Sequence, residues 1–461
     1  MAIDVDTIDS PGWWLNRLAK KHRARLPELE ALHNRYTGDS PVPKSLRDAP
    51  DSAKAFYKTA RTNLAEMLVK AVRYRLAVSA ILTPESRSEA GDSYAWELFR
   101  RSGMLAEQHD VARSALWAGD GYVITAEHEG RLAATAEDPR QVVTIHDPVR
   151  QSQVRAAAKF FHDADYGRAY AYLYRDGRRW VAMRETKSAN VRFSPSWDWS
   201  EAHGGEDGQT VPIAQPVVRY RNEEGVGEYQ RHTDILDRID HLVLQGMAIA
   251  TFQAFKQRGI KADWSEIEDD ALDEDGKSAS LDDVLVADPG AIWKLPQSAD
   301  MWESGAVDLT PITSMANKEI ERLSAVTFTP LWMFIQEGQN QTAAGVSLVR
   351  EGLTYKVVDR QDRLGYAHAQ VVANLYLIDG RAENPPPAED IEIVWRPAER
   401  YGLAEKYSAA TQAVGAGVPW RTRMRDVLQF TPDEVARMET ERLDDELLTP
   451  PPSDAGSDTA P

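Results

Sequence analysis

The sequence predicts an α+β protein that is mainly helical. Apolar residues recur at helical spacing through much of the first 120 residues, in the stretch 234–257 and again beyond residue 312. Between residues 142 and 193 the pattern alternates with a period of two, which is typical of strands. We therefore expect a small antiparallel sheet set among helices.

Three helices are expected before the strands begin. The first contains Pro27 and stops at the turn that starts at Tyr36. The second covers residues 64–76 after a cap at Thr62 or Asn63, and the third covers residues 93–117 and ends at Gly119.

The alternating region predicts strands at 142–145, 169–174 and 180–183. The pair Asp176-Gly177 lies between the last two strands and is a strong signal for a tight hairpin. A further strand is expected at 217–220, after a Gly-rich acidic loop.

The stretch 234–257 predicts the clearest single helix, with Thr233 as its cap and Gly259 at its C-terminal end. Its apolar residues form more than one narrow face, so this helix needs neighbours on several sides. An acid-rich segment follows at 263–283.

A second helix is expected at 312–327, because Thr329-Pro330 stops helical backbone. A long helix then runs to Asp379, and its three glycines predict a bend or close packing. A strand at 391–395 precedes two or three helices in 403–448, the last of which opens at Thr431-Pro432.

Composition excludes several classes of protein. The chain has 461 residues, a formal net charge of −18 and no cysteine, which rules out disulfides and thiolate metal sites. The acidic N-terminus does not resemble a signal peptide, and no apolar run has the length that spans a bilayer. The acidic balance argues against a protein that grips nucleic acid, but it is compatible with one past which DNA slides.

Sequence motifs predict no enzyme, no cofactor and no metal site. No phosphate loop, dinucleotide fingerprint, nucleophile elbow or zinc-protease motif is present. The acidic segment fails as a calcium loop, because Ala271 occupies the first ligand position and Asp282 the twelfth. The histidines never pair at ligand spacing on one helix face.

The order of these parts resembles the portal, or head-to-tail connector, family of tailed bacteriophages. The resemblance rests on the turn after Tyr36, the strand 217–222 that enters the helix containing Ile239-Asp240, and above all the block 308–379. In that block, Lys356, Arg360 and Gln361 lie in the long helix that follows the loop around Asn340.

The resemblance implies an elongated portal-type subunit that assembles into a ring. It places the wing at 1–232, stem helices at 233–262 and 309–329, the clip at 263–308, the tunnel loop at 330–345, the long bent wing helix and wing strand at 346–400, the crown at 401–448 and a disordered tail at 449–461.

Two sets of functional residues are implied by the resemblance. The amide-rich tunnel loop would face DNA through Gln336, Gln339, Asn340, Gln341 and Thr342. The acidic clip would face the packaging terminase or an adaptor through Glu266, Glu268, Asp269, Asp270, Asp273 and Asp275.

The implied function is a DNA channel at one capsid vertex, formed by a ring of about twelve subunits. Its implied partners are double-stranded DNA passing without sequence specificity, the terminase large subunit, the major capsid and scaffolding proteins and a head-completion adaptor, with no membrane. It would be assembled in the host cytoplasm and reside in the virion. The alternatives are another virion structural or scaffold protein and, third, a hydrolase that uses carboxylates of the acidic segment.

Overall fold

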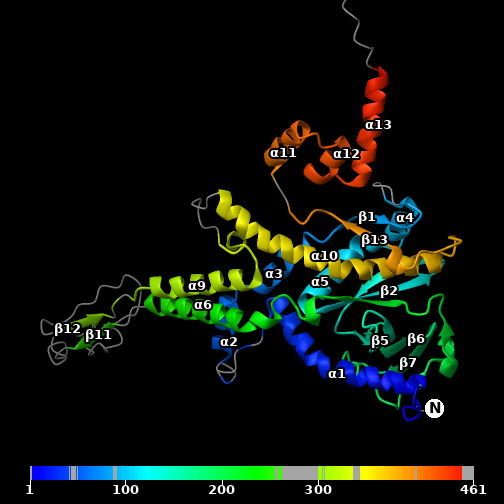
Figure 1. Ribbon diagram of the computed structural model, residues 1–461. Coiled ribbons are helices and arrows are strands. Elements are labelled where there is room, and N and C mark those ends of the chain that lie inside the picture. Colours follow the sequence, from blue (N-terminus) through cyan, green and yellow to red (C-terminus); the bar gives the residue numbers. More distant parts are fainter. Residues whose placement is uncertain are drawn as a thin grey trace, which may run out of the picture. The chain divides into compact units, whose positions relative to one another are not determined.

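The computed structural model describes residues 3–40, 42, 48, 50–86, 91–254, 258–261, 300–303, 305, 307–335, 343–399 and 402–448 (Figure 1). The chain divides into two compact units. Unit 1 contains Met1–Arg47, Thr62–Leu236 and Glu321–Pro461, and unit 2 contains Asp48–Arg61 and Asp237–Ile320. The α+β class predicted from the sequence is confirmed by helices and antiparallel strands in unit 1.

The first helix, α1 (Pro11–Tyr36), contains Pro27 as predicted. Ser10 caps it, because its hydroxyl accepts a hydrogen bond from the N–H of Trp13 at 3.1 Å. The predicted end is confirmed: the helix stops at Tyr36, and Gly38 turns the chain with a φ of 78°.

The second predicted helix is confirmed as α3 (Leu64–Arg73), and its cap is Asn63, which accepts from the N–H of Glu66 at 3.2 Å. The third prediction was wrong in one respect. The stretch 93–117 forms two helices, α4 (Ser93–Arg101) and α5 (Met104–Ala118), because Gly103 adopts a φ of 90° that a continuous helix cannot contain.

The predicted small sheet is confirmed as an antiparallel sheet in the order β4-β5-β6-β7-β8, with β9 also paired to β7. Its strands are β4 (Val142–His146), β5 (Val154–Asp163), β6 (Arg168–Arg175), β7 (Arg178–Glu185), β8 (Asp198–Trp199) and β9 (Gln209–Thr210). Asp176 and Gly177 have φ values of 47° and 72°, the backbone of the expected tight hairpin. Buried residues of α1, including Trp14, Leu15 and Leu18, pack against this sheet.

A second sheet of unit 1 has the order β10-β2-β3 and is antiparallel. It consists of β2 (Asp120–His128), β3 (Arg131–Glu137) and the predicted strand β10 (Val217–Arg221). Both α5 and the long helix α10 (Ala343–Asp379) pack against it. Tyr220 of β10 and His368 of α10 are fully buried there, and the tyrosine hydroxyl lies 3.0 Å from Nδ1 of the histidine.

Strand β1 (Val78–Leu82) pairs with β13 (Glu392–Trp395), so the N-terminal and C-terminal parts of unit 1 share a two-stranded sheet. Gln361 of α10 extends this connection, because its amide donates to the carbonyl oxygens of Arg75 at 3.2 Å and Arg396 at 3.1 Å. The long helix predicted to end at Asp379 is confirmed.

The C-terminal helical region predicted from residue 403 is also confirmed. It consists of α11 (Leu403–Gly415), α12 (Trp420–Thr422), the short π-helix η8 (Arg423–Val427) and α13 (Pro432–Leu448). Thr431 caps α13 as expected: its hydroxyl oxygen accepts from the N–H of Glu434 at 3.4 Å, and the carboxylate of Glu434 accepts in return from the N–H of Thr431 at 2.8 Å. Elsewhere in the described residues, short 3-10 helices are η2 (Glu201–His203), η3 (Gly205–Asp207), η4 (Glu223–Gly225), η5 (Gln230–His232), η6 (Leu331–Met333) and η7 (Ala388–Asp390).

Helices α6 (Thr233–Ala254) and α9 (Thr310–Thr327) confirm the two helices predicted on either side of the acidic segment. Within unit 2 they lie side by side, with Arg238 bonded to Glu319 at 3.0 Å (Figure 1). Unit 2 also holds α2 (Asp51–Ala60) and the paired strands β11 (Arg258–Lys261) and β12 (Asp300–Glu303).

Two details predicted for α6 were wrong. Thr233 is already helical, with φ −60° and ψ −31°, because the 3-10 turn η5 leads directly into the helix. Gly259 does not end the helix, because it lies in β11, where it pairs with Trp302 of β12.

Candidate functional site

The residues predicted to contact DNA and the terminase lie outside the described part of the chain. This applies to the tunnel-loop residues Gln336, Gln339, Asn340, Gln341 and Thr342. It applies equally to the clip residues Glu266, Glu268, Asp269, Asp270, Asp273 and Asp275. The described residues that flank 336–342, the part of the tunnel loop that holds these five side chains, are Ile335 and Ala343; Ile335 follows the C-terminal end of α9 and Ala343 begins α10.

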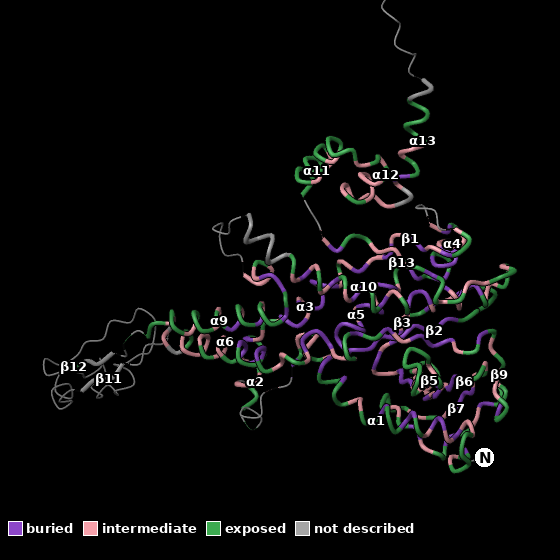
Figure 2. The backbone as a smooth tube through the Cα atoms, in the orientation of Figure 1, coloured by how far each residue is buried: buried purple, intermediate pink, exposed green. Residues whose placement is uncertain are grey.

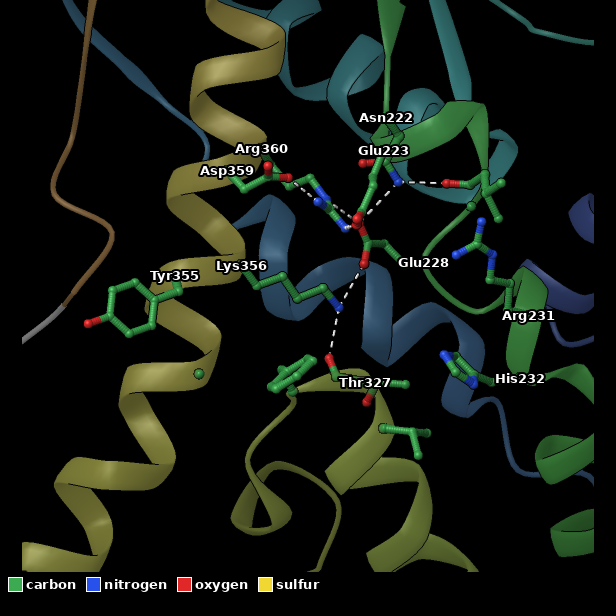
Figure 3. A pocket seen from close by; sticks show the side chains of 15 residues that line it. Asn222, Glu223, Glu228, Arg231, His232, Thr327, Tyr355, Lys356, Asp359 and Arg360 are labelled. Carbon is green, nitrogen blue, oxygen red and sulfur yellow. Dashed lines mark hydrogen bonds and ion pairs between the residues drawn. The ribbon is translucent and has the colours of Figure 1, made fainter.

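A charged cavity of about 550 Å³ lies in unit 1 beside these ends. Three segments line it: the loop 222–232 that follows β10, residues 326–328 at the end of α9, and residues 352–360 of α10 (Figure 3). The cavity therefore joins parts of the chain that are separated by about a hundred residues in sequence.

Glu228 is the centre of the polar contacts in this cavity (Figure 3). Its side chain is only 2% exposed, and its two carboxylate oxygens have different cationic partners. Oε2 lies 2.7 Å from Nζ of Lys356, and Oε1 accepts from Nε of Arg360 at 2.8 Å. Asn222 adds a third donor at 3.1 Å, so the buried carboxylate is well solvated by the protein.

The two cations reach further partners, which ties the three segments together. Lys356 donates to the carbonyl oxygen of Thr327 at 3.0 Å. Thr327 is the last residue of α9, and a positive charge is stabilised there by the partial negative charge at the C-terminal end of the helix. Arg360 donates to Glu223 at 2.9 Å and is paired with Asp359. Because Lys356 and Arg360 are one helical turn apart, both point from α10 into the same cavity (Figure 3).

Electrostatics hold this cluster in its ionised form. Burial alone would raise the pKa of Glu228, but Lys356 and Arg360 outweigh that effect and keep the pKa below its ordinary value. The pKa of Arg360 is correspondingly raised, since Glu228 and Glu223 outweigh its own burial. At the cavity wall, burial and then the charge of Lys356 lower the pKa of His232.

The end of α9 has a strained backbone at the same place. Phe328 adopts a φ of 51° although it is a bulky residue, and the N–H of Thr329 donates to the carbonyl oxygen of Ser324 at 3.1 Å. Phe328 is 65% exposed, and its ring faces Gly352, where an added Cβ would lie 3.3 Å from the ring. The glycine thus leaves room for the aromatic side chain.

This arrangement is suited to joining segments rather than to catalysis. The positive charges of Lys356 and Arg360 are paired with three carboxylates, those of Glu228, Glu223 and Asp359. Both oxygens of the buried Glu228 carboxylate are engaged in ion pairs, so this group is not poised to accept a proton. The cluster fastens α10 to the end of α9 and to the loop after β10.

Sequence reasoning named Lys356 and Arg360 but missed Glu228, their common partner. Two cations one turn apart on a helix are compatible with a shared acidic partner, yet nothing in the pattern identified which of 72 Asp and Glu residues it was. The loop 222–232 offered several candidates.

Two other kinds of site are absent from the described residues. No group of three or more His, Asp or Glu side chains in the described ranges could hold a metal ion. None of the helices in that part of the chain combines the length and apolar character needed to cross a membrane.

Comparisons with known proteins give one family and several structures. No curated protein matches the sequence. Solved structures that resemble the chain include the virion of a native gene transfer agent (GTA) particle, at 14% identity, 82% coverage of this chain, 94% coverage of that chain and a TM-score of 0.44. A second is the neck of an empty GTA particle computed with C6 symmetry, at 14% identity, 83% coverage of this chain, 94% coverage of that chain and a TM-score of 0.45. A third is the neck of a native GTA particle computed with C12 symmetry, at 13% identity, 82% coverage of this chain, 93% coverage of that chain and a TM-score of 0.45.

The family match extends over nearly the whole chain. A family model described as "Phage portal protein, SPP1 Gp6-like" matches residues 15–446, which include both units and the charged cavity. The chain belongs to this family of phage portal proteins.

Proposed function

We propose that the protein forms a closed ring of about twelve subunits at one capsid vertex, through which DNA enters during packaging and leaves at ejection. The family match over residues 15–446 is the observation that carries this proposal. In this role the protein is a passive conduit of the virion and not an enzyme, and a separate terminase supplies the energy.

The burial pattern of unit 2 supports assembly into a ring. Among its described residues, the apolar side chains that are buried are Tyr57, Ala60 and Ile239. Further along α6, five large apolar residues remain half-exposed in a single subunit: Leu242, Val243, Leu244, Met247 and Ile249. Figure 2 shows α6 and α9 mostly in the intermediate and exposed colours. Such helices gain stability when a neighbouring subunit covers them.

We assign the regions of the subunit from the resemblance to portal proteins. The wing comprises 1–232, with the long helix and strand in 346–400; the stem comprises 233–262 and 309–329; the crown comprises 401–448. The clip, 263–308, is the docking surface for the terminase large subunit and a head-completion adaptor, and the outer regions meet capsid and scaffolding proteins. The tunnel loop, 330–345, faces the DNA.

The ring is tested by the size and shape of the purified protein. Light scattering combined with electron microscopy is expected to show rings of about twelve subunits with an axial hole. The alternatives are a different virion structural or scaffold protein and a carboxylate hydrolase. A stable monomer that never forms rings under packaging conditions would refute the portal assembly and favour one of these.

The tunnel loop is tested separately by deletion of residues 336–342. We expect rings to form normally while DNA packaging or retention fails, because the loop contacts DNA and not the neighbouring subunit. Loss of ring formation in the deletion variant would show instead that this segment belongs to the packed core. A deletion of equal length in the tail, 452–458, is the matched control.

A further inference from the structure

A stretch of α1 carries positive charge on a chain that is otherwise strongly acidic. From Ser10 to Pro27 the sequence contains no Asp or Glu, but it contains Arg17, Lys20, Lys21, Arg23 and Arg25. The whole chain has a formal net charge of −18. A basic segment of this kind is typical of surfaces that bind nucleic acid, although a solvated helix face is the commoner explanation.

Three strands, β4, β2 and β10, lie beside this basic stretch of α1, and β10 adds a further cation. Lys21 donates to the carbonyl oxygen of Thr144 at 2.8 Å, which brings its ammonium against β4. Arg25 donates to Asp120 at 2.6 Å, at the start of β2. Arg219 lies on β10, next to β2, and donates to the carbonyl oxygen of Gln151 at 3.2 Å. We call Lys21, Arg25 and Arg219 the α1 basic cluster.

The α1 basic cluster has more positive than negative charge. Asp120 is engaged by Arg25, and Glu28 adds a weaker attraction for the same guanidinium. Within the described part of the chain, Lys21 and Arg219 have backbone carbonyl partners and no ion pair. An ammonium carries three donors and a guanidinium five, so both side chains retain hydrogen-bonding capacity for an anion.

Burial and, after it, like charge disfavour the charged forms of these side chains. Partial burial, followed by the charges of Arg219 and Arg25, lowers the pKa of Lys21. Burial lowers the pKa of Arg219 as well, and the attraction of Asp120 does not restore it. Burial together with Arg219 and Lys21 lowers the pKa of the adjacent His146 to about 4, so this histidine is neutral and adds no charge. A bound anion would relieve this repulsion.

The cluster is accessible and extended, which favours a polyanion over a single enclosed phosphate. Lys21, although partly buried, keeps a large exposed surface, and Arg219 is half-exposed. Arg17 lies one turn before Lys21 on α1 and is also exposed, so the positive charges continue along the helix. All of these side chains offer charge and hydrogen-bond donors, which suit phosphate oxygens and carry no sequence information.

We propose that the α1 basic cluster binds neighbouring phosphates of a duplex DNA backbone, at a surface separate from the tunnel loop. This adds a second DNA contact to the channel proposed above. With Lys21 and Arg219 as the two uncompensated cations, binding is weak and falls roughly tenfold between 50 and 200 mM salt.

The test uses covalently closed circular duplex DNA and preassembled protein at 50 mM salt. A closed circle cannot thread through a closed ring, so its binding reports a surface outside the channel, whatever the outcome for the channel itself. We expect co-sedimentation with wild type, at least tenfold weaker binding for the double variant Lys21→Gln/Arg219→Gln, and retention of binding in Lys21→Arg/Arg219→Lys.

Lys20→Gln/Arg23→Gln is the matched control, because it removes the same two positive charges from exposed positions of α1 outside the cluster. Equal weakening by this control would refute the assignment and indicate attraction by net charge alone. Binding of inorganic pyrophosphate without binding of circular DNA would also overturn it, in favour of a small phosphate ligand. Failure of the Gln double variant to assemble, with normal assembly of the Lys/Arg exchange variant, would identify the cluster as a contact with the neighbouring subunit instead.

Discussion

At the scale of single residues, Glu228 shows how a buried charge can hold distant segments together. Its carboxylate is shared by Lys356 and Arg360, and neither cation can return to water without opening the cavity. A buried ion pair contributes little net stability compared with an apolar replacement, but removal of one partner is costly. The cluster therefore determines which segments meet rather than supplying most of the folding energy.

We expect Glu228→Gln to lower the free energy of unfolding by about 3–5 kcal/mol, because Lys356 and Arg360 are left without their buried counter-charge. Chemical unfolding of the unassembled subunit measures the change. Glu223→Gln is the control: this residue contacts the same Arg360 but is 52% exposed, so its loss should cost less than about 1 kcal/mol. Equal effects of the two substitutions would show that Glu228 is not central.

The same carboxylate predicts a pH dependence. The pKa of Glu228 is lower in the folded chain than its ordinary value of 4.5, so its contribution is fully present above pH 4.5. That contribution is lost as pH falls through the lower folded pKa. The difference in stability between wild type and Glu228→Gln should thus be largest near neutral pH and shrink below pH 4.5. A constant difference at acid pH would contradict this assignment.

At the scale of elements, left-handed glycines decide where helices end. Gly103 separates α4 from α5 with a φ of 90° and has open space around it. Gly119 ends α5 with a φ of 84°, and an added Cβ there would lie 2.1 Å from the carbonyl oxygen of Gly225. Both positions require left-handed backbone, but only the second is also confined by a neighbouring chain segment.

These two glycines make a matched pair for mutation. Gly103→Ala should destabilise the subunit by about 1–2 kcal/mol through backbone strain alone. Gly119→Ala should cost about 3 kcal/mol or more, because the methyl group also collides with Gly225. Thermal unfolding of the unassembled variants measures both. Similar losses for the two would mean that the loop at Gly225 moves aside without cost.

Local signals predicted most of the elements. The hairpin at Asp176-Gly177, the caps Asn63 and Thr431 and the ends at Tyr36 and Asp379 all depend on neighbouring residues, and all were predictable. The break at Gly103 was not, because a single glycine inside an apolar pattern is also compatible with an unbroken helix. The helical start of α6 at Thr233 was hidden for a similar reason, since the preceding 3-10 turn has no sequence signature.

At the scale of the whole molecule, contacts between remote segments lay beyond sequence reasoning. The sheet of β1 with β13 and the ion pairs of Glu228 with α10 each join residues more than a hundred positions apart. The order of the regions stays a prediction, because it depends on family resemblance and the family match over residues 15–446 marks no boundaries inside the chain. The half-exposed apolar residues of α6 were also anticipated, since their pattern was too broad for a single partner.

The assembly proposed for unit 2 leads to a prediction for α6. Leu242→Asn together with Met247→Asn should raise the protein concentration needed for ring formation at least about tenfold, because each subunit loses apolar surface at its interface. Gln245→Ala, an exposed position on the same helix, is the control. Analytical ultracentrifugation measures the distribution of species. Unchanged assembly in the double variant would place the subunit interface elsewhere.

The path of the chain through the two units has a consequence for how such a protein diversifies. The polypeptide leaves unit 1 at Leu236 and re-enters it at Glu321, so residues 237–320 form an insertion within unit 1. We expect family members to vary the length of this insertion, together with Asp48–Arg61 of the same unit, while the pairing of β1 with β13 and the packing of α10 are retained.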